Sequence, residues 1–135
     1  MFFPLDQVLL NALVLRLPED RRLIAQDQIA KVSDARTMHY GTASETMMWR
    51  QGPFGIPVSD LETFSFPSEE AILATVKFKC RGRRYAADYI VLNNVLFMIK
   101  YNKSTKDIMD ETDVEIIGID VDAVLIDQFG LALSD

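Results

Sequence analysis

The chain has 135 residues, a formal net charge of −6 and a hydrophobic share of 49%. This length and composition are typical of one globular domain and exclude an intrinsically disordered chain. A single cysteine, Cys80, excludes an intramolecular disulfide and a zinc site built from several thiolates, and it favours a cytoplasmic location. The negative charge disfavours nucleic acid as a partner.

Two helices are predicted at the N-terminus, over residues 5–32. Leu5, Leu9 and Leu13 recur with the spacing of one helical face. Pro18 ends this helix and opens the next, so the two form a helical hairpin. The first apolar stretch has no basic residue before it and is too short to span a bilayer. We therefore expect neither a signal peptide nor a membrane anchor.

The pattern between residues 33 and 69 is weaker and leaves both strand and loop open. Short strands are expected at residues 36–40, 45–50 and 61–66, with a Gly- and Pro-rich loop at residues 51–57. Methionine and aromatic residues concentrate here, and they line either a core or an interface. These residues are Met38, Tyr40, Met47, Met48, Trp49, Phe54 and Ile56.

A three-stranded meander is predicted over residues 71–101, because apolar and polar residues alternate there. Turns are expected at Asn93-Asn94 and at Gly82-Arg83, or at Arg81-Gly82 with the pairing slipped by two residues. One face should be covered by the helices. It carries Ile72, Ala74, Val76, Phe78, Tyr85, Ala87, Tyr89, Val91, Leu96 and Met98. The other face carries an apolar patch that needs a cover, formed by Ile90, Leu92, Val95, Phe97 and Ile99.

A further strand is predicted over residues 114–122, followed by a short helix that starts near Val124. These elements predict a single α+β domain over residues 1–135. Its two N-terminal helices pack on a curved, mainly antiparallel sheet of four to six strands.

Motifs for catalysis or metal binding are weak. His39 is the single histidine, and alternation turns Cys80 into the apolar face, so a reactive Cys–His pair is not expected. The acidic run over residues 107–115 lacks the spacing of a calcium loop. We therefore predict no catalytic residue, no metal and no cofactor, and we consider an enzymatic activity open but disfavoured.

The leading functional prediction is a non-enzymatic protein-interaction module. It is expected to form a homodimer through the apolar patch of Ile90, Leu92, Val95, Phe97 and Ile99. The alternative is a small-ligand-binding or lightly catalytic protein with a pocket between sheet and helices. That pocket would be lined by His39, Trp49, Tyr85, Asp88, Tyr89 and Met98.

A third prediction concerns the basic hairpin at residues 77–84. Its positive charges suit an anion, an acidic protein partner or, with lower expectation, nucleic acid. They belong to Lys77, Lys79, Arg81, Arg83 and Arg84.

Overall fold

The computed structural model describes residues 2–51 and 60–121, which form two helices and a six-stranded antiparallel sheet. The helices are α1 (Pro4–Arg16) and α2 (Glu19–Ala30). The strands are β1 (Asp34–Tyr40), β2 (Ala43–Trp49), β3 (Glu70–Cys80), β4 (Arg83–Leu92), β5 (Val95–Tyr101) and β6 (Glu115–Asp120). Their order across the sheet is β1-β2-β5-β4-β3-β6. The predicted α+β class, with helices before the sheet, is confirmed.

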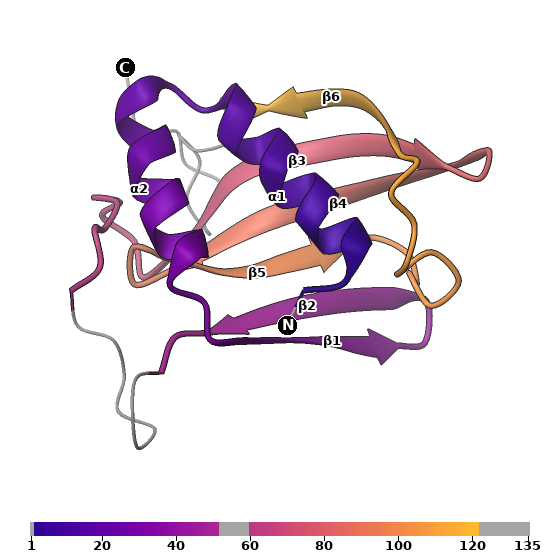
Figure 1. The fold of residues 1–135 in the computed structure, drawn as a ribbon, viewed down its shortest axis with the longest axis horizontal. Coiled ribbons are helices and arrows are strands. Elements are labelled where there is room, and N and C mark those ends of the chain that lie inside the picture. Colours follow the sequence, from indigo (N-terminus) through magenta and orange to yellow (C-terminus); the bar gives the residue numbers. More distant parts are fainter. Residues whose placement is uncertain (1, 52–59, 122–135) are drawn as a thin grey trace.

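The two helices lie side by side on the same face of the sheet (Figure 1). We call this face the inner face and the opposite one the outer face. Neither helix covers the outer face. The fold therefore has one helical layer and one sheet layer, and the two sides of the sheet meet different surroundings.

Local sequence explains the helical hairpin. Pro4 occupies the first turn of α1, where a missing N–H costs nothing. Pro18 precedes α2, whose first turn carries two acidic residues. The Arg22 side chain then donates from Nε to the Val14 carbonyl at 3.0 Å and from Nη2 to the Leu17 carbonyl at 3.1 Å. These bonds satisfy carbonyls that the end of α1 leaves open.

Three tight turns set the strand registers. Gly41, after β1, has a φ of 60°, and Asn93 and Asn94, between β4 and β5, have φ values of 50° and 66°. Arg81 and Gly82 join β3 to β4 with φ values of 51° and 76°. The turn is therefore Arg81-Gly82, and the first expected choice, Gly82-Arg83, is wrong. Two successive positive φ angles match the twist of a hairpin, and glycine adopts them without strain.

The shifted turn changes the cross-strand partners. Asp88 lies opposite Thr75, whereas a Gly82-Arg83 turn would have placed it opposite Lys77. The inner-face members Phe78 and Tyr85 become direct partners, and their rings stack with centroids 5.2 Å apart. A slip of two residues preserves the face of every side chain, so the predicted inner face survives this error in β4.

Two β-bulges correct the predicted faces further. The register shifts between Ile72 and Ala74 in β3, and again opposite Ile90 and Val91, where β5 contains the extra residue Phe97. Each bulge inserts one residue and reverses the alternation beyond it. Ile72 and Met98, predicted on the inner face, therefore lie on the outer face, directly across from Ile90.

The core lies between the helices and the inner face. Leucines of α1 pack against the aromatic and aliphatic residues of the sheet, and Phe64 from the segment before β3 joins them. The largest fully buried side chains are Tyr89, Tyr101, Phe78, Leu5, Leu9, Leu10, Leu13, Leu17, Met48, Leu73, Leu96 and Ile99.

The region with the weak sequence pattern contains both strand and loop. The first two expected short strands are present as β1 and β2, whereas residues 61–66 form no strand. Gln28, fully buried in α2, holds this segment instead. Its Nε2 donates to the carbonyls of Glu62 and Asn94, and its Oε1 accepts from the Leu96 N–H. The helix expected near Val124 lies outside the described residues.

Candidate interaction surface

Large apolar side chains gather on one half of the outer face. Trp49 and Phe97, from β2 and β5, meet edge to face with ring centroids 6.4 Å apart. Most members of this cluster are partly exposed, and Ile90 keeps 8% of its surface accessible. We call the cluster the apolar half; its residues are Met47, Trp49, Ile72, Ile90, Leu92, Val95, Phe97 and Met98.

The predicted apolar patch is largely part of this cluster, with one correction. The β5 bulge turns Ile99 to the inner face, where it is fully buried in the core. Ile99 therefore cannot contribute to a surface, and its assignment to the patch is wrong. Ile90, Leu92, Val95 and Phe97 remain on the outer face.

A row of charged residues borders the apolar half. Lys100 on β5 lies directly between Glu45 on β2 and Asp88 on β4. Thr75 on β3 continues the row, and its hydroxyl donates to the Asp88 carboxylate at 2.8 Å. Opposite charges on neighbouring strands stabilise each other weakly at an exposed face. The row leaves more negative than positive charge beside the apolar half.

A hollow of about 320 Å³ lies where the charged row meets the apolar half. Its floor is aliphatic, and its walls carry three carboxylates and one ammonium group. The lining residues are Glu45, Glu70, Ala71, Ile72, Asp88, Ile90, Met98 and Lys100. The hollow can therefore receive a side chain with an apolar stem.

The basic hairpin divides its charges between two places. Lys77, Lys79 and Arg84 lie on the outer face, beyond the charged row. Arg81, in the turn, is paired with Glu111 through both Nε and Nη2. Arg81 and Arg83 together line a hollow of about 360 Å³, away from the outer face. The five predicted contact residues thus do not form one site.

The six residues of the predicted ligand pocket are also dispersed. Tyr85 and Tyr89 belong to the core, and the Tyr89 hydroxyl donates to the Leu9 carbonyl at 2.6 Å. Trp49, Asp88 and Met98 lie on the outer face.

His39 lies on β1, where its Nδ1 is 2.7 Å from the Ser44 hydroxyl. Three strands separate it from Cys80 on β3, so the histidine and the thiol are not adjacent. Burial raises the pKa of the Cys80 thiol, so a smaller fraction of this cysteine is in the reactive thiolate form.

A buried polar network joins α1 to the sheet. The Asp6 carboxylate accepts hydrogen bonds from the Tyr101 hydroxyl at 2.6 Å and the Thr46 hydroxyl at 2.9 Å. The Thr46 hydroxyl in turn lies 2.9 Å from that of Thr37. Burial raises the pKa of Asp6, although these hydrogen bonds act in the opposite direction. Burial and the neighbouring Asp6 charge also raise the pKa of Tyr101. Sequence patterning gave no sign of this network.

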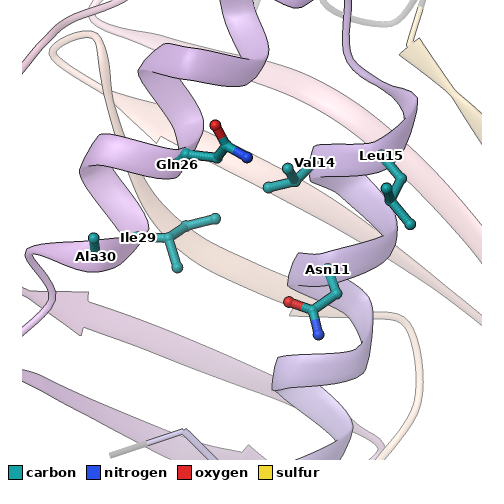
Figure 2. A pocket seen from close by; sticks show the side chains of 6 residues that line it. All are labelled: Asn11, Val14, Leu15, Gln26, Ile29 and Ala30. Carbon is teal, nitrogen blue, oxygen red and sulfur yellow. The ribbon is translucent and has the colours of Figure 1, made fainter.

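A further groove runs between the helices, on the side away from the sheet (Figure 2). It measures about 490 Å³, and α1 and α2 each contribute three side chains. The residues are Asn11, Val14, Leu15, Gln26, Ile29 and Ala30. The groove offers few polar contacts to a ligand, because only two of its lining side chains, Asn11 and Gln26, are polar.

The described residues contain neither a metal-binding cluster nor a helix able to cross a membrane. No group of three or more His, Cys, Asp or Glu side chains within residues 2–51 and 60–121 is arranged to hold a metal ion. Neither α1 nor α2 has the length and hydropathy that crossing a membrane requires.

The outer face had a signal in the sequence. Met38 and Tyr40, like Met47 and Trp49, are two residues apart, and this spacing puts each pair on one face of a strand. The structure leaves 44% of the Met38 surface and 50% of the Tyr40 surface exposed on this face.

Comparisons of the chain with family models, with curated proteins and with solved structures find no match.

Proposed function

We propose that the chain is a non-enzymatic protein-interaction module that self-associates through the outer face of its sheet. The observation that carries this proposal is the apolar half. Its large side chains lie together on a face that neither helix covers. A contiguous apolar surface of this kind is typical of protein contacts.

The two bulges support the same reading. Without them, Ile72 and Met98 would point into the core, as simple alternation predicts. The bulges instead put Ile72 and Met98 on the outer face beside Ile90 and turn Leu73 and Ile99 into the core. Bulges that redirect side chains are characteristic of functional surfaces.

Symmetry favours a second copy as the partner. A two-fold axis parallel to the strands, between β4 and β5, sets each strand against the other one in the partner. Lys100 then faces the partner's Asp88, and Met98 faces the partner's Ile90. Each contact occurs twice, and charge meets opposite charge while apolar meets apolar. The strands of the two sheets stay aligned, which is a common way for sheets to pack.

Substitution of Phe97 tests the surface. Phe97→Asp places a carboxylate in the contact and is expected to weaken dimerisation by roughly a hundredfold, the effect of removing a central anchor. Sedimentation equilibrium over a range of concentrations measures this change. The matched control is Leu23→Asp on α2, where the leucine is 61% exposed, and it should leave dimerisation unchanged.

Two outcomes would contradict the proposal. A wild-type chain that stays monomeric at several hundred micromolar removes self-association. An unchanged dimer of Phe97→Asp places the contact elsewhere. A charge swap then tests the axis: Lys100→Glu should weaken the dimer, and adding Asp88→Lys should restore it. If Lys100→Glu weakens the dimer and Asp88→Lys does not restore it, the outer face remains the contact surface, but the proposed two-fold axis is wrong.

A further inference from the structure

In the part of the chain that the structure describes, the side of β1 away from β2 is an open edge of the sheet. Among residues 2–51 and 60–121, β1 pairs with β2 and with no other strand. A two-residue turn at positions 41–42 joins the two strands, so Tyr40 and Ala43 flank the turn. In such hairpins the flanking pair exchanges both backbone hydrogen bonds, and the pattern alternates from there. Thr37 and His39 therefore direct their N–H and C=O groups away from β2.

Side-chain distances agree with this assignment. The Thr37 and Thr46 hydroxyls lie 2.9 Å apart, and His39 reaches the Ser44 hydroxyl at 2.7 Å. Such close approach is typical of cross-strand pairs that share no backbone hydrogen bond. The Ala35 N–H also bonds outside the ladder, to the Asp34 carboxylate at 3.0 Å. The open positions of the edge are thus the backbone groups of Thr37 and His39.

The opposite edge of the sheet is protected. β6 has six residues, and its pairing with β3 is broken by a register shift. Glu115 and Asp120 add charge at its two ends, and Arg16 donates to the Ile119 carbonyl at 3.4 Å. Bulges, shortness and charge are the usual protections against strand addition. β1 has seven residues and pairs with β2 without any shift. Its charged residues, Asp34 and Arg36, pair with each other at 3.1 Å and lie in the first half of the strand, before Thr37 and His39.

The side chains of β1 also suit a partner strand. Met38 and Tyr40 point to the outer face with 44% and 50% of their surfaces exposed, and the Tyr40 hydroxyl lies 3.4 Å from the Met38 sulfur. Thr37 and His39 point to the inner side. A strand laid along the second half of β1 would meet Met38 and Tyr40 on the outer side and polar groups on the inner side, whereas the Asp34–Arg36 ion pair lies on the outer side near the start of β1.

We infer that the β1 edge binds an extended peptide segment of a different protein by β-strand addition. The N–H and C=O groups of Thr37 and His39 form the new ladder. The segment carries apolar side chains at alternate positions, next to Met38 and Tyr40, and no proline at the bonded positions.

The choice of a different protein over a second copy rests on the proposed function. The second copy already occupies the outer face. A second two-fold contact, with its axis at the β1 edge, would then link dimers into an open chain. The reason is that this axis does not meet the first axis, which lies between β4 and β5. A peptide from another protein leaves the assembly closed, and each dimer offers two acceptor edges.

The probe is a phage-displayed library of random heptapeptides, which match the length of β1. Selection on the wild-type chain, followed by fluorescence polarisation with a synthesised peptide, measures binding. We expect peptides with apolar residues at alternate positions. Met38→Lys should weaken their binding at least tenfold, since an edge lysine opposes strand addition. Ile117→Lys, at a residue 45% exposed on β6, is the matched control and should bind normally.

Amide hydrogen exchange supplies a second readout, independent of the substitution. In the free chain the amides of Thr37 and His39 should exchange quickly, and those of Met38 and Tyr40 slowly. The selected peptide should slow the first pair. Peptides that bind Met38→Lys as tightly as wild type, or that protect other amides, would overturn the inference.

Sedimentation separates this inference from the proposed function. Phe97→Asp should abolish the dimer and leave peptide binding intact. If the Phe97→Asp chain still self-associates and Met38→Lys abolishes that remaining association, the occupant of the edge is a second copy, and the inference of a foreign peptide is wrong.

Discussion

The two faces of the sheet are built from the same strands and have opposite fates. On the inner face, large side chains such as Phe78 and Tyr89 are buried in one core with the leucines of α1, and the hydroxyl groups of Tyr101 and Thr46 donate to the buried Asp6 carboxylate. On the outer face, apolar side chains such as Phe97 and Met98 lie beside a charged row that includes Lys100. Burial on one side therefore does not require a polar surface on the other.

This difference shows what alternation can and cannot do. A regular strand divides its side chains between two faces, but one inserted residue exchanges them beyond that point. The β3 and β5 bulges make this exchange for Ile72 and Met98. The bulges therefore change which apolar side chains lie on the outer face: Ile72 and Met98 are there, whereas Leu73 and Ile99 are buried in the core.

The largest expected effect comes from a core aromatic. Phe78→Ala should lower the free energy of unfolding by about 3–5 kcal/mol, because the side chain is fully buried and leaves a cavity. Phe97→Ala is the matched change on the outer face and should cost less than half as much in the monomer. Urea unfolding at low protein concentration compares the two variants. Equal losses in the free energy of unfolding would mean that Phe97 on the outer face is buried as fully as Phe78.

A smaller effect should follow from the buried polar network. Tyr101→Phe removes the hydroxyl that donates to Asp6 and should cost about 1–3 kcal/mol, the usual effect of leaving a buried acceptor short of a partner. Tyr40→Phe is the control, since its exposed hydroxyl contacts the Met38 sulfur on the outer face. Similar stabilities for the two variants would argue that the network contributes nothing.

The smallest expected effect is a pH dependence. Burial raises the pKa of Asp6 above its ordinary value of 3.8, so the folded state favours the protonated carboxyl. This contribution is fully present below the ordinary value and is lost as pH rises through the raised pKa. Unfolding of the wild type and of Asp6→Asn, measured from about pH 4 to pH 7, isolates it. The stability of the wild type relative to the variant should fall over this range.

Asp27 provides a control of opposite sign. The Glu62 N–H and Lys31 lower the pKa of its carboxyl, so its contribution is lost as pH falls. Asp27→Asn should therefore remove stability that the wild type holds at neutral pH. A stability difference for Asp6→Asn that is independent of pH would show that Asp6 titrates normally.

Much of the fold was accessible from local patterns. Helical spacing predicted α1, and alternation between positions 71 and 101 predicted β3, β4 and β5. The asparagine turn was also correct, because Asn93 and Asn94 tolerate positive φ. The hairpin turn at Arg81-Gly82 was ambiguous, since one glycine can occupy either turn position and both registers keep the same faces.

The candidate surface was predicted in part. Ile90, Leu92, Val95 and Phe97 were assigned to the correct face, but the bulge at Phe97 turned Ile99 into the core. The edge position of β1 was beyond local patterns. Strand order depends on which hydrophobic faces pair at long range, and no short segment encodes that order.

The sequence alone determined the elements with strong periodicity and the tight turns, because these depend on neighbours within a few residues. Tertiary structure decided the bulges, the buried partners of Asp6 and the free edge of β1. Each of these arises from contacts between segments far apart in the chain, where packing and hydrogen bonding outweigh the local preference.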